Sequence, residues 1–227
     1  RMRKRKKCLC AVKLDMMKAY DRVDWVFLEK ALAKWGFSPS WIARVMACVS
    51  SVKYSVKFNG KLLESFSPSR GLRQGDPLSP FLFLFVADAI SALVEKAARE
   101  NGLSGVKISR GAPVITHLLF ADDSLILMQA NASNATSLRR ALDDYCAASG
   151  QLVSEAKSSI FFSPCTPVDT RVEVCTSLNI MAEAITDKYL VLPPIVGVDR
   201  TDCFQHLIDR VCQMLKGCKK KNTLNAR

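Results

Sequence analysis

Three aspartates are the side chains whose type and spacing best suit chemistry. Asp15 ends an apolar stretch, and Asp122 and Asp123 stand between two apolar runs, which predicts a strand end and a hairpin tip. Carboxylates gathered at one sheet edge repel, because like charges ~4 Å apart cost on the order of several kcal/mol at a partly desolvated site. Two Mg²⁺ ions would neutralise them and support phosphoryl transfer. The aspartates therefore predict a two-metal site.

A simpler interpretation of the Asp122-Asp123 pair stays open. Aspartate is a routine turn residue because its side chain bonds nearby backbone, and taken alone the pair fits an ordinary turn somewhat better than a metal site. The order along the chain favours the metal site: the carboxylate of Asp15, then a turn that contains Gln74-Gly75, then the aspartate pair. This set is what nucleotidyl transfer needs if two hard cations are to be held beside a paired template and primer.

Hydrophobic periodicity and turn signals predict the elements that position these residues. Asp24 is expected to cap a helix that ends at Gly36, and Ser38-Pro39 to start a second one. Asn59-Gly60 is the strongest hairpin signal in the chain. The remaining predicted elements are strands at 11–15, 52–58, 61–66, 106–109, 114–120, 124–129 and 158–163, and helices at 80–101 and 134–149.

This order of elements predicts an α+β fold, with an antiparallel sheet, helices packed on one face and a split β-α-β layout over residues 8–163. Residues 164–227, with an amphipathic helix near 203–215, are interpreted as the truncated start of a second element. Because the chain begins with Arg1, we interpret it as an internal piece of a longer protein.

The net charge of +12 is concentrated at the two ends. Residues 1–7 carry six positive charges and residues 216–227 carry five, without an acid in either stretch. The middle is therefore close to neutral, with 22 basic against 21 acidic residues. Such tails favour phosphate contact at low salt, but a solvated flexible end is the commoner fate of a basic run.

The nine cysteines lack paired C-x-x-C spacing, and His117 and His206 stand alone, so neither a zinc site nor a disulfide framework is predicted. Free thiols in a reducing compartment are expected. The apolar run that begins at Phe81 stops at Asp88, too short to cross a bilayer. These features predict an intracellular protein of the nucleus or cytoplasm that does not insert into membranes.

Three segments resemble motifs A, B and C of reverse transcriptases, in the form found in plant non-LTR (LINE-type) retrotransposons. They are Leu14–Trp25, which contains Asp15, then Gly71–Pro80, and His117–Ser124, which contains Asp122 and Asp123. Further similarity runs from 149–151 to 158–163, so that the resemblance covers about residues 8–197. It implies a polymerase palm, and as activity an RNA-directed DNA polymerase with an RNA template, a DNA primer and deoxynucleoside triphosphates as partners.

The resemblance also implies site residues. Asp15, Asp122 and Asp123 become the ligands of two Mg²⁺ ions, for which Mn²⁺ can substitute, and Met16 contributes its backbone carbonyl. Tyr20 becomes the aromatic gate under the incoming sugar, which excludes a 2′-hydroxyl. Ordinary core packing of Tyr20 is the alternative.

Motif B and motif D add further implied roles. Gln74 and Gly75 would lie against the nascent base pair and the template strand, and Arg73 would touch phosphate, although surface arginine is the commoner fate. Lys157 would donate a proton to the departing pyrophosphate; a lone loop lysine is more often simply solvated.

The chain also departs from the family pattern. Ser154 replaces an asparagine and Val191 a glycine, no counterpart of the fingers region precedes motif A, and the thumb is at best begun. Because positioning supplies much of phosphoryl-transfer catalysis, a catalytically inactive nucleic-acid-binding remnant is the alternative function, and an unstable relic without activity a third.

Overall fold

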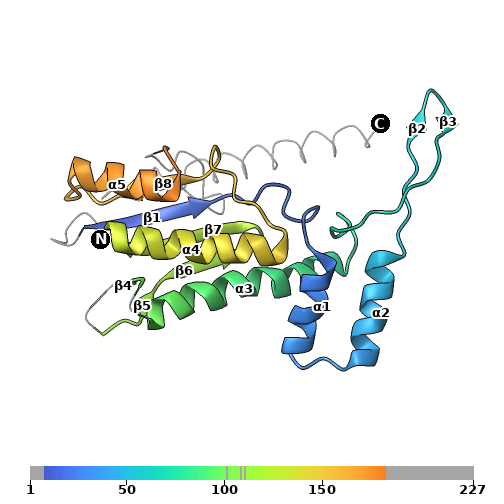
Figure 1. The fold of residues 1–227 in the computed structure, drawn as a ribbon, viewed down its shortest axis with the longest axis horizontal. Coiled ribbons are helices and arrows are strands. Elements are labelled where there is room, and N and C mark those ends of the chain that lie inside the picture. Colours follow the sequence, from blue (N-terminus) through green and yellow to red (C-terminus); the bar gives the residue numbers. More distant parts are fainter. Residues whose placement is uncertain (1–7, 101, 108, 110, 183–227) are drawn as a thin grey trace, which may run out of the picture. The chain divides into compact units, whose positions relative to one another are not determined.

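In the computed structural model, residues 8–100, 102–107, 109 and 111–182 are described (Figure 1). All the described residues belong to one compact unit of the chain. Its elements, in chain order, are β1 (Leu9–Leu14), α1 (Trp25–Lys34), α2 (Pro39–Ser50), β2 (Lys57–Phe58), β3 (Lys61–Leu62), α3 (Ser79–Arg99), β4 (Val106–Lys107), β5 (Val114–Ile115), β6 (His117–Phe120), β7 (Asp123–Gln129), α4 (Ala132–Ser149), β8 (Ser159–Phe162) and α5 (Val168–Leu178).

A four-stranded antiparallel sheet with strand order β6-β7-β1-β8 forms the centre of the fold. Strand β1 is paired on both edges, with β7 from Leu9↔Gln129 to Leu14↔Ser124 and with β8 from Cys10↔Phe162. Two-stranded ribbons, β2-β3 and β4-β5, complete the pairing in the described part of the chain. The predicted α+β class with an antiparallel sheet is confirmed.

The core lies between one face of this sheet and helices α3 and α4. Alternate residues of β1, namely Cys10, Val12 and Leu14, have no solvent exposure and join a cluster that includes Val86 of α3 and Leu138 of α4. All six residues of β1 are buried, and these three share one face because side chains alternate along a strand. The predicted packing of helices on one face is confirmed, and Figure 1 shows α4 lying along the sheet beside α3.

Local caps set the helix starts. The Asp24 carboxylate accepts a hydrogen bond from the Phe27 amide at 2.8 Å, and the Ser38 side chain accepts one from the Trp41 amide, as predicted for α1 and α2. The predicted start of α4 at Asn134 is wrong. Asn131 caps this helix instead, and its side chain accepts from the Asn134 amide at 2.8 Å.

Several strands are shorter than predicted, whereas β1 and β7 begin earlier in the chain than predicted. The 52–66 hairpin has its turn at Asn59-Gly60, with φ of 46° and 81°, but only two residues of each strand pair regularly, followed by an isolated Tyr54–Phe66 bridge. The predicted strand at 114–120 is interrupted at Thr116, because its first part pairs with β4 and its second with β7. In the described segments, no helix is both long and apolar enough to cross a membrane.

Helix α5 was not predicted. Its buried face carries only Val174, Cys175 and Leu178, which pack against the core in a segment of weak amphipathicity. The predicted helix at 203–215, the basic tails and Val191 lie outside the described residues. The domain boundary after residue 163 stays a prediction.

Candidate active site

The register of the central sheet brings the three predicted aspartates to one edge. The β1–β7 ladder ends at Leu14↔Ser124, and Asp15 and Asp123 are the residues next to this last pair. Phe120 pairs with Asp123, so Ala121 and Asp122 form the two-residue turn between β6 and β7, in which Ala121 has φ of 52°. The strand end and the hairpin tip are thus neighbours, as predicted.

The electrostatics of Asp123 report this proximity. Partial burial raises the pKa of the Asp123 carboxyl, Lys13 lowers it, and the charges of Asp122 and Asp15 raise it. Lys13 is itself only 8% exposed, in the strand that ends immediately before Asp15. Sequence reasoning missed Lys13, although its position two residues before Asp15, on the same side of the strand, was the available signal.

The side chains of the neighbouring carboxylates do not converge on one point in this structure, within the residues that it describes. Among the described residues, no three His, Cys, Asp or Glu side chains are arranged so that they could hold a metal ion. The donor chemistry still suits Mg²⁺, because carboxylate oxygens are the ligands that this hard cation prefers. The mutual repulsion at Asp123 is also of the sign that a bound cation would relieve.

Two backbone contacts hold Asp15 at the sheet edge. The Asp15 amide donates to the Ser158 hydroxyl at 3.1 Å, and the Asp15 carbonyl accepts from the Ser154 amide at 2.8 Å. At Ser154 the contact uses only the backbone, so it does not depend on the replaced asparagine side chain. Lys157 lies in this same segment and is exposed.

Tyr20 lies between the core and the carboxylates. Its ring stacks on Phe83 of α3, with centroids 4.9 Å apart and planes 13° from parallel. Burial raises the pKa of the Tyr20 phenol, and Asp122 raises it further. Gln151, fully buried and absent from the predicted site, supports this segment because its Nε2 donates to the Ala19 carbonyl at 2.8 Å. Tyr20 therefore packs on the core while its phenol feels the charge of Asp122, and its role as a sugar gate stays a prediction.

Motif B is attached to motif A through the backbone. The Gly71 amide donates to the Val23 carbonyl and the Leu72 amide to the Tyr20 carbonyl, both at 2.8 Å. Gly71 has φ of 95°, and a Cβ there would lie 2.8 Å from the Asp21 carbonyl oxygen. Glycine is therefore required at position 71 by both conformation and space.

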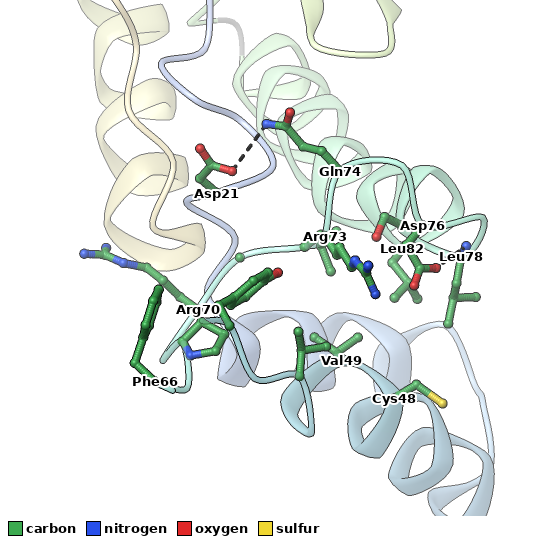
Figure 2. Close-up of a pocket in the computed structure, with 16 residues that line it drawn as sticks. Asp21, Cys48, Val49, Phe66, Arg70, Arg73, Gln74, Asp76, Leu78 and Leu82 are labelled. Carbon is green, nitrogen blue, oxygen red and sulfur yellow. Dashed lines mark hydrogen bonds between the residues drawn. The ribbon is translucent and has the colours of Figure 1, made fainter. Parts of the chain in front are cut away.

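A pocket of ≈ 730 Å³ opens beside this junction (Figure 2). Its walls come from the C-terminal end of α2, the base of the 52–66 hairpin, the motif B loop and the start of α3. Gln74 and Arg73 line it, and Gln74 Nε2 donates to the Asp21 carboxylate at 3.3 Å. The predicted site is thus divided. The motif B side chains line the pocket, whereas Asp15, Asp122 and Asp123 lie outside its lining.

Gly75 lies next to the pocket lining. Its φ of 85° requires glycine, and no heavy atom outside its immediate neighbours lies within 4 Å of a Cβ placed there. The roles assigned to Arg73, Gln74, Gly75, Tyr20 and Lys157 stay predictions.

Comparison with known proteins agrees with this geometry. A family model described as reverse transcriptase (RNA-dependent DNA polymerase) matches residues 1–194. The chain belongs to the reverse transcriptase family. The predicted resemblance over about residues 8–197 is confirmed, and by this membership the chain is related to RNA-directed DNA polymerases.

Individual relatives of this reverse transcriptase domain include mobile-element proteins. It is similar to an uncharacterized mitochondrial protein of Arabidopsis thaliana, at 48% identity over 29% of this chain and 54% of that protein. It is 29% identical to the transposon TX1 149 kDa protein of Xenopus laevis, over 66% of this chain and 11% of that protein. It is 31% identical to an R2 retrotransposable-element polyprotein of Popillia japonica, over 55% of this chain and 17% of that protein. The chain thus spans about half or less of each relative.

A solved structure supports the fold alone. Telomerase from Candida albicans, solved with a fragment of telomeric RNA, is similar to this reverse transcriptase domain with a TM-score of 0.50 and 17% identity. The match covers 67% of this chain and 26% of that chain.

Proposed function

We propose that this chain is the palm of an RNA-directed DNA polymerase from a non-LTR retrotransposon, and that it adds deoxynucleotides to a primer 3′ end. The observation that carries the proposal is the sheet register, whose last pair, Leu14↔Ser124, brings the adjacent Asp15 and Asp123 to one edge, with Asp122 in the adjoining turn. Membership of the reverse transcriptase family and similarity to retrotransposon proteins support the reaction class.

Asp15, Asp122 and Asp123, with the Met16 carbonyl, are the residues proposed to hold two Mg²⁺ ions. When bound, such ions supply a lowered pKa for an attacking hydroxyl and charge stabilisation for a phosphate leaving group. Lys13 has a separate role, since its charge beside Asp123 favours the ionised carboxylate that metal binding needs.

Other residues orient the substrates. Tyr20, held by its stacking on Phe83, is proposed to face the sugar of the incoming deoxynucleotide. Arg73 and Gln74 are proposed to contact the RNA template and DNA primer from the pocket, with Gly75 next to them. Lys157, exposed in the segment bonded to Asp15, is the proposed proton donor to pyrophosphate.

One observation favours a second candidate, a non-catalytic nucleic-acid-binding remnant. The carboxylates are not arranged as a metal-ligand set anywhere in the described ranges. This candidate expects binding that needs no Mg²⁺, weakens steeply with salt and survives Asp122→Asn.

Primer extension on an RNA template with Mg²⁺ and deoxynucleotides tests the two candidates. The 227-residue chain is compared with Asp122→Asn and with Asp144→Asn, which changes an exposed aspartate of α4 and serves as the matched control. Extension that only Asp122→Asn abolishes supports the polymerase. Extension unaffected by Asp122→Asn overturns the site assignment, and no extension by any chain favours the remnant.

A further inference from the structure

The 52–66 hairpin exposes an apolar face that the proposed chemistry does not use. Alternation along the first strand puts Tyr54, Val56 and Phe58 on one face. The Tyr54–Phe66 bridge and the bond from the Leu63 amide to the Val56 carbonyl bring Phe66 and Leu63 to the same face. These five side chains are between 38% and 63% exposed.

Three of the five side chains are aromatic, and two of them are already paired. The rings of Tyr54 and Phe66 lie with centroids 5.9 Å apart, tilted by 33°, and Phe58 extends the row to the tip of the ribbon. A two-stranded ribbon with an exposed apolar face is marginal in water, so such a surface indicates a bound partner. Row-like aromatic surfaces are the platforms on which nucleic-acid bases stack.

The charge of the segment points to the same kind of partner. Residues 51–75 contain five basic side chains and a single acid, Glu64. The basic residues are Lys53, Lys57, Lys61, Arg70 and Arg73. A ribbon is narrow, so the flexible stems of its lysines reach either face. Aromatic rings among positive charges match a strand of bases and phosphates better than an apolar protein segment.

The apolar face runs into the pocket of Figure 2. Tyr54 and Phe66 also line that pocket, together with Arg73 and Gln74 of the motif B loop and the acids Asp21 and Asp76. Figure 2 shows Phe66, Arg73 and Gln74 around it. Figure 1 shows the ribbon projecting from this point, beyond the end of α2. One continuous surface therefore leads from the motif B loop, through the pocket, to the tip of the ribbon.

The structure assigns this surface to the unpaired, single-stranded part of the template, whose bases stack on Tyr54, Phe66 and Phe58 while its phosphates meet the lysines. This inference rests on the proposed function, because it is the polymerase that supplies a template strand with an unpaired end. It adds a binding platform outside the carboxylate site.

Fluorescence anisotropy with a labelled single-stranded RNA oligonucleotide tests the platform on the full chain. The triple variant Tyr54→Leu/Phe58→Leu/Phe66→Leu keeps the surface apolar but removes every ring. We expect its affinity to fall on the order of tenfold or more, since stacking is lost at several bases. The control is Trp35→Leu, which removes an exposed ring at the end of α1. Unchanged binding by the triple variant, or an equal loss with Trp35→Leu, overturns the platform.

A second variant tests the platform without removing the rings, in case the triple variant misfolds the ribbon. Lys57→Gln/Lys61→Gln leaves the apolar face intact, and we expect it to bind more weakly with a shallower salt dependence. If binding and salt dependence match the unchanged chain, the platform is wrong.

The two experiments distinguish a wrong platform from a wrong polymerase proposal. Primer extension by the unchanged chain together with full binding by the triple variant overturns the platform and keeps the polymerase. Ring-dependent binding without any extension keeps the platform and overturns the polymerase.

Discussion

At the scale of one residue, the surroundings of Asp123 disfavour the ionised form of its carboxyl group. Burial and the neighbouring charges of Asp122 and Asp15 raise the pKa of its carboxyl, and only Lys13 acts the other way. The ionised form is therefore less favourable in the folded chain than in the unfolded chain at neutral pH. A carboxyl group whose pKa is raised by neighbouring carboxylates is typical of a cation-binding site.

Asp123→Asn is expected to stabilise the fold while it abolishes primer extension. Removing one of the like charges gathered at this sheet edge should raise the free energy of unfolding by on the order of 0.5 kcal/mol at neutral pH. Urea unfolding without Mg²⁺ measures the change, and Asp144→Asn is the control. A lower stability for Asp123→Asn would show that the carboxylate is satisfied by its surroundings.

His117 predicts how stability depends on pH. Its Nε2 lies 2.6 Å from the Ser91 hydroxyl of α3 and its Nδ1 2.9 Å from the Thr116 hydroxyl. Burial lowers the pKa of His117, although Glu95 and Asp88 raise it. Below an ordinary histidine pKa of about 6.5 the unfolded chain takes up a proton that the folded chain resists, so stability is lost as pH falls.

The expected result is a melting temperature that declines between about pH 7 and pH 5.5, and declines less in His117→Gln. Thermal unfolding in matched buffers checks it. An equal decline in both chains would assign the effect to other groups.

At the scale of elements, the sequence predicts what local chemistry decides. Asp24 and Ser38 cap their helices through side chains within three residues, and Asn59-Gly60 closes a turn by itself, so each signal lies in one short window. The start of α4 was misplaced because Asn131 and Asn134 are both good caps, and the choice between them depends on tertiary contacts.

The same distinction applies to the site. The neighbourhood of Asp15 and the aspartate pair follows from a strand end and a hairpin tip. The hydrogen bonds that hold motif A in place could not be predicted in this way, because Ser158 and Gln151 contact motif A across more than 130 residues of sequence. Helix α5 was missed for a related reason: its three buried side chains gain their burial from packing against other elements.

Asn134 joins α4 to β7 and to the loop before β4, and Asn134→Ala is expected to cost about 2 kcal/mol of stability. Its side chain accepts from the Ser104 amide at 2.8 Å and donates to the Gln129 carbonyl at 3.0 Å, so the substitution leaves two backbone groups unpaired. Chemical denaturation measures the loss, with Ser133→Ala on the exposed side of α4 as control. A cost equal to that of the control would contradict the structural role.

At the scale of the whole molecule, the carboxylate edge links folding to metal binding. A ligand that binds only the folded chain stabilises it by mass action, by about 1.4 kcal/mol at ten times its dissociation constant. Mg²⁺ is therefore expected to raise the melting temperature of the unchanged chain and to have little effect on Asp122→Asn/Asp123→Asn. Thermal unfolding with Mg²⁺ and with excess chelator provides the comparison. Equal shifts in both chains would place the ion elsewhere.

The central position of β1 has a consequence for synthesis of the chain. Within this sheet, the nearly all-apolar strand β1 is synthesised before its partners β7 and β8, which begin at Asp123 and Ser159. At cellular elongation rates it waits about 5 to 20 s for the first of them. During that time the backbone N–H and C=O groups along both edges of β1 are unpaired and can bond to another nascent chain. Productive folding therefore competes with aggregation. Yield in the cell should therefore depend on chaperones that shield the nascent strand.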